Sequence, residues 1–347
     1  MMKLTVVAYL VLLSLFCAIT LTSCGGVSGA AATAAASPVA AGSDIAAFVA
    51  NSQNASLSVI NTATDKLAAS IPLGEPYGST ASYPSSVAIT PDGTRAYVAD
   101  GNEAVWVVAT ANNNVIGKIV VGPQATSPYQ LAITPDGKTV YVTTYDSVVA
   151  IDIATNSIAT TICLGKYPYG IAITPDGKRA YVTNTDYNYM WVIDTHTNQV
   201  VATIPTPNNS WGVAITPDGS RAYVTDGDNS FFVIDTKTNR LVAAISTQGQ
   251  DLWRLAITPD GSRAYIAAFD GVLVINTCTN KPLTEIPVSN EGAAIAGVAI
   301  TPDGTRAYVT SGNTNTVSVI ATATNSVVAS LTSPVTPNAV AISSRPQ

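Results

Sequence analysis

The strongest constraint on this fold is a phrase that occurs six times: an apolar triplet, Thr-Pro-Asp-Gly, and a strand centred on tyrosine. An isoleucine ends each triplet, and a truncated seventh copy closes the chain. These isoleucines are Ile89, Ile133, Ile173, Ile215, Ile257, Ile300 and, in the truncated copy, Ile342. Their successive spacings are 44, 40, 42, 42, 43 and 42 residues. A fixed period of this size, made of short strands and turns, is typical of a repeat array.

The third copy shows what one repeat contains. In its exit turn, Pro175 presets φ, Asp176 tolerates the second turn position, and Gly177 accepts a positive φ before the chain reverses. Segments rich in β-branched residues, each bounded by turn residues, predict four strands. These strands are Gly170–Ile173, Arg179–Thr183, Met190–Asp194 and Gln199–Ile204. Each repeat should therefore form one antiparallel sheet, or blade.

The two ends of the chain complement each other, which indicates a closed ring. The chain finishes with Val340–Ile342, a first strand with no second strand behind it. The globular part begins with Ala47–Val49, which matches a second strand and has no first strand. We therefore predict an all-β, seven-bladed β-propeller in which the C-terminal inner strand joins three N-terminal strands. An open solenoid would leave both partial blades incomplete, whereas closure removes open sheet edges.

The motif Tyr181-Val182-Thr183-Asn184, with the repeated Ile-Thr-Pro-Asp-Gly phrase, makes the chain resemble the YVTN-repeat β-propellers. The resemblance runs from about residue 43 to residue 347. It implies a seven-bladed propeller that is usually exported. The wider family is said to include surface-layer proteins, lactone hydrolases, a lyase and cofactor-carrying reductase domains. The resemblance therefore does not choose a function.

Residues 1–23 resemble a bacterial lipoprotein signal peptide: Lys3 precedes the apolar run Leu4–Leu21, and Leu21-Thr22-Ser23-Cys24 resembles a lipobox. Cys24 would then carry the lipid, and residues 24–42, rich in Ala, Gly and Ser, would tether a propeller at 43–347. An uncleaved membrane helix is the alternative, because the run is nearly long enough to span a bilayer. We expect an exported cell-envelope protein, in the outer membrane and periplasm or on the cell surface, that contacts the membrane through its lipid only.

Cysteine usage agrees with an envelope protein that lacks disulfides. Cys163 falls in the second blade and Cys278 in the fifth, counting from the blade that begins near Val87. Blades three apart cannot bring two Cα atoms within bridging distance, so both residues should be free thiols.

Alternating strand directions divide the turns between two rims. The Thr-Pro-Asp-Gly turns and the turns between third and fourth strands share one rim, the bottom. An arginine recurs near each turn aspartate, and we expect local ion pairs of little energetic value. The arginines are Arg95, Arg179, Arg221, Arg263 and Arg306, and the aspartates are Asp92, Asp176, Asp218, Asp260 and Asp303. This interpretation makes the bottom rim purely architectural.

The loops between second and third strands and the connections between blades share the other rim, the top, and most of the acidic excess falls there. Ten acids face only Lys166 and Arg254, in a chain whose net charge is −6. The acids are Glu75, Asp100, Glu103, Asp146, Asp186, Asp226, Asp228, Asp251, Asp270 and Glu291. Such a face repels phosphates and disfavours nucleic acid, whereas cations, amines or a basic protein patch match it.

The position just before each inner strand carries the sharpest local signal. Around the ring it is occupied by Ser85, Tyr129, Tyr169, Trp211, Trp253, Ala296 and Asn338. Four consecutive blades thus present an aromatic arc at the channel mouth, with Tyr187 nearby. Aromatic arcs hold sugars, peptides or cationic groups, but rings here could also merely cover strand ends. Arg254 could grip a carboxylate, or it could neutralise Asp251, Asp226 or Asp228.

The missing residue types exclude several chemistries. His196 is the one histidine and lies in a bottom turn, so neither a histidine metal cluster nor a Ser-His-Asp relay can be assembled. We therefore expect no catalytic residues, no transition metal and no cofactor, with calcium on the acidic top as the one weak alternative. Acid–base chemistry through Asp226, Asp228 or Asp186 with a tyrosine is conceivable, but no motif supports it.

These observations predict a monomeric binding or scaffolding module whose top face takes a protein partner or a small polar or cationic ligand. The candidate residues are Tyr129, Tyr169, Trp211, Trp253, Arg254, Tyr187, Asp226 and Asp228. Two alternatives stay open: an envelope hydrolase or lyase acting on a small carbohydrate or lactone, and a structural surface-coat component.

Overall fold

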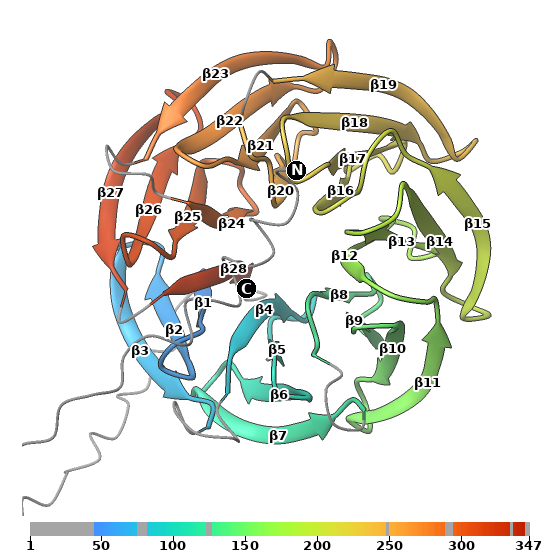
Figure 1. The fold of residues 1–347 in the computed structure, drawn as a ribbon. Coiled ribbons are helices and arrows are strands. Elements are labelled where there is room, and N and C mark those ends of the chain that lie inside the picture. The colour runs from blue at the N-terminus through green and yellow to red at the C-terminus, as the bar shows by residue number, and fades with distance from the viewer. Residues whose placement is uncertain are drawn as a thin grey trace, which may run out of the picture. The chain divides into compact units, whose positions relative to one another are not determined.

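In the computed structural model, each repeat folds into a four-stranded antiparallel sheet, and seven sheets stand around a central axis (Figure 1). The structure describes residues 45–74, 82–122, 127–247, 250–288, 294–333 and 336–343, all in the second of the two units into which the chain divides, residues 36–347. The predicted signal peptide, the tether and Cys24 lie outside the described residues. We number the blades along the chain, beginning with the first complete repeat.

Blades 1–3 follow one another from the N-terminal side. Blade 1 comprises β4 (Pro84–Ile89), β5 (Arg95–Asp100), β6 (Ala104–Ala109) and β7 (Asn114–Val120). Blade 2 comprises β8 (Leu131–Ile133), β9 (Thr139–Thr143), β10 (Ser147–Asp152) and β11 (Ser157–Cys163). Blade 3 comprises β12 (Pro168–Ile173), β13 (Arg179–Asn184), β14 (Tyr189–Asp194) and β15 (Gln199–Pro205).

Blades 4–6 repeat the same order, and blade 7 is composite. Blade 4 comprises β16 (Val213–Ile215), β17 (Arg221–Thr225), β18 (Ser230–Asp235) and β19 (Arg240–Ser246). Blade 5 comprises β20 (Leu255–Ile257), β21 (Arg263–Ala267), β22 (Gly271–Asn276) and β23 (Lys281–Pro287). Blade 6 comprises β24 (Ile295–Ile300), β25 (Arg306–Ser311), β26 (Thr316–Ala321) and β27 (Ser326–Thr332). Blade 7 comprises β28 (Pro337–Ser343), β1 (Ala46–Asn51), β2 (Ser56–Asn61) and β3 (Lys66–Pro72).

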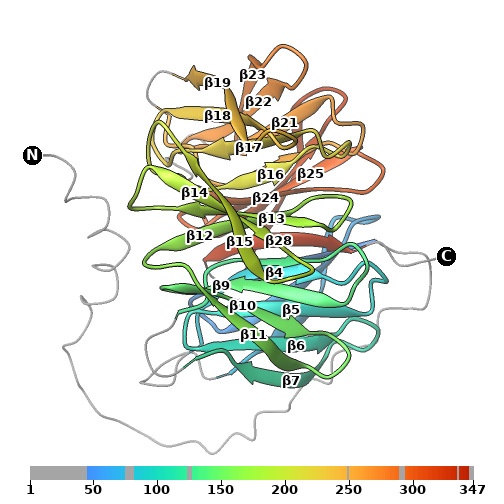
Figure 2. The ribbon, with the colours of Figure 1, turned by 90° about the vertical axis from the view of Figure 1, so that its right-hand side faces the viewer.

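The predicted closure is confirmed. β28 pairs with β1 in antiparallel register, with Val340 opposite Val49 and Ala341 opposite Phe48. The inner strands contact each other in the order β28, β4, β8, β12, β16, β20, β24 and again β28, so the ring has no gap. Figure 2 shows the ring from the side, with the blades stacked around it. Both described ends lie on the bottom rim, where the backbone N–H of Thr62 donates to the carbonyl of Ile45 and β28 ends at Ser343.

The core is divided into seven apolar clusters, one between each pair of neighbouring blades. Both faces of each blade are therefore covered by the neighbouring blades. This explains why second and third strands such as β13 and β22 are buried along nearly their whole length. The outer strands are exposed edges, and each carries a β-bulge next to its third strand. Bulges twist an edge away from pairing with another chain.

A tyrosine latch joins most neighbouring blades. The hydroxyl of Tyr181 is typical: it donates to Asn239 Oδ1 of the next blade at 2.7 Å. The same bond links Tyr97 to Asn156, Tyr141 to Asn198, Tyr223 to Asn280, Tyr265 to Asn325 and Tyr308 to Asp65. Each acceptor has a positive φ between 51° and 56° in its turn. Blade 7 has Phe48 in place of tyrosine, and Asn113 Oδ1 in blade 1 is consequently buried without a partner.

The expected ion pairs between the bottom arginines and the turn aspartates are wrong. Each turn aspartate instead closes its own turn: Asp92 Oδ1 accepts from the Thr90 hydroxyl at 2.6 Å and from the Thr94 backbone N–H at 3.0 Å. Most of the arginines cross to the next blade, as Arg95 does when it donates to the carbonyl of Ile153 at 2.6 Å. The long arginine side chain reaches the carbonyl of a neighbouring turn because adjacent blades stand side by side at this rim. The turn aspartate is already satisfied by hydrogen bonds within its own turn.

Candidate functional site

Three of the four predicted arc residues form a continuous row of rings at the top of blades 2–4. The centroids of Tyr129 and Tyr169 are 5.6 Å apart, and those of Tyr169 and Trp211 are 5.0 Å apart with the planes at 62°. All three side chains are half-buried, so each keeps some surface for a ligand. Trp253 is also half-buried, but within the described part of the chain its ring contacts no other aromatic ring.

Threonines of the preceding blades fix the backbone under this row. The Thr143 hydroxyl donates to the carbonyl of Tyr169 at 2.6 Å, and the Thr183 hydroxyl donates to the carbonyl of Trp211 at 2.6 Å. Thr225 donates in the same way to the carbonyl of Trp253. Each threonine is the third residue of a Tyr-Val-Thr triplet, so the motif that builds the blade also positions the aromatic residue of the next blade. This role was not expected from the sequence, although each threonine follows the tyrosine of its own triplet at a fixed spacing.

Trp211 packs against the backbone of a neighbouring loop. Gly227 has a φ of +72°, and a Cβ added to it would lie 2.2 Å from the indole of Trp211. Only glycine leaves room for the ring at this position, and only glycine adopts this backbone without strain. The loop Asp226–Ser230 therefore packs closely against the ring of Trp211.

A second aromatic group extends the row outward over blades 2 and 3. The rings of Tyr145 and Tyr167 meet edge to face at 5.1 Å, and Tyr187 stacks on Tyr189 at 5.8 Å. Tyr187 is 45% exposed. The hydrogen bond to Tyr145 raises the pKa of Tyr167 to about 12, and burial raises the pKa of Tyr129. These hydroxyls therefore stay protonated at neutral pH and offer hydrogen-bond donors rather than a base.

The acidic side chains of the top face divide into buried and exposed groups. Asp226 is only 4% exposed, and its oxygens accept from the Ser230 hydroxyl, from Asn208 Nδ2 at 3.1 Å and from the backbone N–H of Asp228 at 3.0 Å. These hydrogen bonds stabilise the loop, and the burial of Asp226 leaves almost no surface for contact with a ligand. Asp100 is fully buried in a similar role. Asp146, Asp186, Asp228 and Asp270 are exposed, and Glu75 and Glu291 lie outside the described residues.

Asp228 and Asp251 repel each other across the edge of the aromatic row. Burial, and secondly the charge of Asp228, raise the pKa of Asp251 above its ordinary value. A bound cation would relieve this repulsion. Among the described residues, no group of three or more His, Cys, Asp or Glu side chains is placed to hold a metal ion.

Arg254 follows neither sequence-based interpretation. Its Nη2 donates to the carbonyl of Ser85 at 2.9 Å, and its Nη1 donates to the carbonyl of Asn338 at 3.5 Å. Ser85 belongs to blade 1 and Asn338 to blade 7, so the side chain of this blade 5 residue crosses the channel mouth. The ion pairs found among the described residues do not include Arg254. The arginine therefore links blades 7 and 1 through hydrogen bonds that a blade 5 side chain makes across the channel mouth.

The remaining predicted features lie away from the top face. His196 is exposed in the bottom turn of blade 3, as predicted. Cys163 and Cys278 are both free and exposed, which confirms the prediction of free thiols. Within the described ranges, no helix has the length and apolar character needed to cross a membrane.

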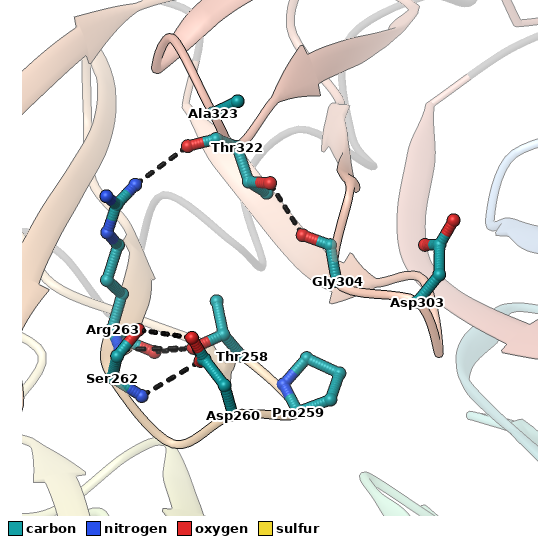
Figure 3. A pocket seen from close by; sticks show the side chains of 9 residues that line it. All are labelled: Thr258, Pro259, Asp260, Ser262, Arg263, Asp303, Gly304, Thr322 and Ala323. Carbon is teal, nitrogen blue, oxygen red and sulfur yellow. Dashed lines mark hydrogen bonds between the residues drawn. The ribbon is translucent and has the colours of Figure 1, made fainter.

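Two grooves open between the turns of the bottom rim, for which the sequence predicted an architectural role only. Figure 3 shows the smaller groove, about 250 Å³, between blades 5 and 6, where Arg263 donates to the carbonyl of Thr322 at 2.7 Å. The larger groove, about 900 Å³, lies at the equivalent place between blades 2 and 3.

Solved structures support the fold. The chain resembles Kuenenia stuttgartiensis hydrazine synthase with a TM-score of 0.68 and 24% identity, over 74% of this chain and 88% of that one. It also resembles a functionally unknown protein from Desulfotomaculum acetoxidans DSM 771 with a TM-score of 0.73 and 18% identity, over 86% of this chain and 98% of that one. At this identity the likeness establishes a propeller fold and nothing finer. No family model matches the sequence, and no curated protein matches it.

Proposed function

We propose that this protein is a cell-envelope binding module that holds a cationic ligand on the top face of blades 2–4. The observation that carries the proposal is the row formed by Tyr129, Tyr169 and Trp211, with exposed carboxylates such as Asp186 and Asp228 on the loops beside it. Aromatic faces attract ammonium and guanidinium groups, and nearby carboxylates add long-range attraction. The ligand class is an organic amine or a basic segment of a partner protein.

The lipoprotein-like sequence around Cys24 supports an anchored location. The described chain begins at Ile45 on the bottom rim, so a tether from the N-terminal side would reach this rim first. Metabolic labelling with a fatty acid tests this part: the wild-type chain should incorporate label and Cys24→Ser should not. Equal labelling of both chains would contradict lipidation at Cys24.

An enzymatic role has less support. One structural neighbour bears the name of an enzyme, but its 24% identity carries the fold alone. The raised pKa values of Tyr129 and Tyr167 disfavour a tyrosine base, and Asp226 is enclosed by hydrogen bonds. These features agree better with binding than with proton transfer.

Tryptophan fluorescence and calorimetry test the binding proposal directly. Titration of the full-length protein with tetramethylammonium or with a lysine-rich peptide should give saturable binding that weakens as salt increases. Trp211→Ala should weaken it by about tenfold or more, equivalent to about 1.4 kcal/mol, while Trp211→Phe should retain most of it. Binding that is equally strong in Trp211→Ala and in Tyr169→Ala would show that the row only packs.

A surface-coat role is the second candidate, and one observation favours it. The outer strands expose aliphatic side chains at equivalent positions after each bottom turn. These are Leu67, Val115, Ile116, Ile158, Val200, Val201, Leu241, Val242, Leu283, Val327 and Val328. Repeated exposed apolar residues favour self-association. Sedimentation velocity should show concentration-dependent assembly if this role holds, and a monomer at high concentration would contradict it.

A further inference from the structure

The large groove on the bottom rim exists where one repeat has lost its arginine. Thr139 occupies the position taken by Arg263 in blade 5, two residues after the turn glycine. Part of the lining corresponds between the two grooves, with Thr134, Pro135 and Asp136 matching Thr258, Pro259 and Asp260, whereas Lys178, Arg179 and Asp194 line only the larger groove. In the blade 5–6 groove the guanidinium crosses the opening (Figure 3). In the blade 2–3 groove nothing in the described chain replaces it.

The carbonyl at the far wall shows what the missing arginine leaves behind. A carbonyl oxygen can accept two hydrogen bonds. Thr277 uses both, accepting from Arg221 Nη1 at 3.3 Å and from the Tyr223 hydroxyl at 2.8 Å. Thr195, its counterpart in blade 3, accepts from the Tyr141 hydroxyl at 3.1 Å, and the described residues provide no guanidinium for it. One acceptor position of this carbonyl is therefore open on the groove.

The charged side chains that line the groove are already arranged in three pairs. Lys138 Nζ lies 3.7 Å from Asp136, and Lys178 Nζ lies 3.8 Å from Asp176, with both lysines mostly exposed. Arg179 turns back to pair with Asp194 of its own blade instead of crossing to blade 4. The cationic groups of the groove are thus neutralised locally, which makes it a poor anion site. Asp194 directly precedes Thr195 and brings a carboxylate to the same wall.

We propose that this groove binds a guanidinium group, held by the carbonyl of Thr195 and by the carboxylate of Asp194, which the guest would share with Arg179. The guest would take the place that Arg263 occupies in the blade 5–6 groove. A planar guanidinium can donate to a carbonyl and a carboxylate together, whereas an ammonium is a compact point charge. The volume of about 900 Å³ leaves space beyond the head group for the remainder of a ligand or for an arginine of a partner chain. This site is independent of the top-face function.

Blade 7 lacks the arginine as well. Ala46 stands at the arginine position there, so the blade 7–blade 1 gap also lacks a crossing guanidinium. The chain before Ile45 lies outside the described residues, and we assign no site to that gap. The blade 2–3 groove is bordered by described residues throughout.

The single histidine of the protein provides the reporter for a test, because His196 lines this groove. Proton NMR of the full-length protein should show a saturable shift of the His196 imidazole signals on titration with Nα-acetyl-arginine methylamide. The matching lysine compound should bind about tenfold more weakly, since it lacks the planar fork. Absence of a saturable shift with the arginine compound would overturn the proposal.

Two variants separate this site from a general charge effect. Thr139→Arg should fill the groove as Arg263 fills its own, abolish the His196 shift and raise the melting temperature. Thr139→Val, which keeps the groove open, should retain the shift, and so should Trp211→Ala on the top face. If circular dichroism shows that Thr139→Arg is unfolded, Thr139→Met serves as the filling variant. A guest-induced shift that persists unchanged in a folded filling variant would contradict the assignment.

The source of the guanidinium is resolved by comparing probes on the wild-type protein. A tripeptide with a central arginine should bind about tenfold more tightly than methylguanidinium if the natural guest is a protein segment. Equal affinity would identify a small guanidino compound as the guest. Lack of binding by both probes would refute the site altogether.

Discussion

The two rims of the ring are built from the same repeats but differ in how closely their copies agree. On the bottom rim, the Thr-to-Asp hydrogen bond occurs in all six complete turns, and the tyrosine latch joins six of the blade pairs. On the top, one equivalent position is occupied by Asn51, Asp100, Thr144, Asn184, Asp226, Ala268 and Ser311. The bottom turns pack against their neighbours and must match. The side chains at this top position are also buried, but most of them hydrogen-bond within their own loops, so one blade can differ from the next. Thr139 interrupts the series of arginines on the bottom rim, and Arg254 reaches across the channel mouth on the top. Each of them marks a place where the ring departs from its symmetry.

The comparison predicts that the largest loss of stability comes from the matched parts between blades. Tyr181 is fully buried between blades 3 and 4. Tyr181→Ala should lower the free energy of unfolding by about 3–5 kcal/mol, because it removes a large packed ring. Tyr181→Phe keeps the ring and should cost only about 1–3 kcal/mol through the unsatisfied Asn239. Urea unfolding followed by circular dichroism measures both, and equal losses would show that the hydroxyl, not the ring, dominates.

Glycine substitutions sharpen the contrast between the rims. Gly219 and Gly227 have φ values of +73° and +72°, so alanine should strain either backbone by about 1–2 kcal/mol. At Gly219 the added Cβ would meet Pro175 at an ordinary 3.4 Å, but at Gly227 it would collide with Trp211. We expect Gly227→Ala to lose more stability and also to weaken binding of tetramethylammonium, measured by calorimetry. Intact binding in that variant would argue against Trp211 as a ligand contact.

The interface between blades 7 and 1, which lacks the tyrosine hydrogen bond, should accept a stabilising change. Phe48→Tyr places a hydroxyl opposite Asn113 Oδ1, which is buried without a partner. The new hydrogen bond should raise the free energy of unfolding by about 1 kcal/mol, measurable by differential scanning calorimetry. The double variant Phe48→Tyr with Asn113→Ala provides the control. The gain should disappear there because the acceptor is removed.

Acid should weaken the bottom rim gradually, with the smallest effect from any single residue. The hydroxyl of Thr258 and the backbone N–H of Ser262 hold the pKa of Asp260 at about 2, below its ordinary 3.8. Equivalent hydrogen bonds lower the pKa of Asp218. Because the folded pKa lies below the unfolded one, this stabilisation is present above about pH 4 and is lost as the pH falls toward 2. The melting temperature should therefore decline across this range. Asp260→Asn should make the decline slightly shallower, and an unchanged slope would exclude Asp260 as a contributor.

Several features of the candidate site were within reach of the sequence, and others were not. The aromatic position before each inner strand identified Tyr129, Tyr169 and Trp211, because a repeat alignment places equivalent residues around one mouth. The same alignment suggested Trp253 and Asp226 as site residues, but the described structure gives Trp253 no ring partner and buries Asp226. Whether a side chain points outward or into its own loop depends on short-range hydrogen bonds, such as that from Ser230 to Asp226, which no periodicity reports.

The sequence by itself determined the number of blades, the order of strands and the one-plus-three closure. Strand period, turn chemistry and complementary chain ends are local properties, and each repeat reports them independently. The tertiary structure alone decided which residues meet across the ring. Arg254 reaches Ser85 over 169 residues of chain, and Thr139 opens a groove whose acceptor belongs to the next blade. Such contacts depend on how the blades face one another, and this arrangement exists only once the apolar clusters between them have closed the ring.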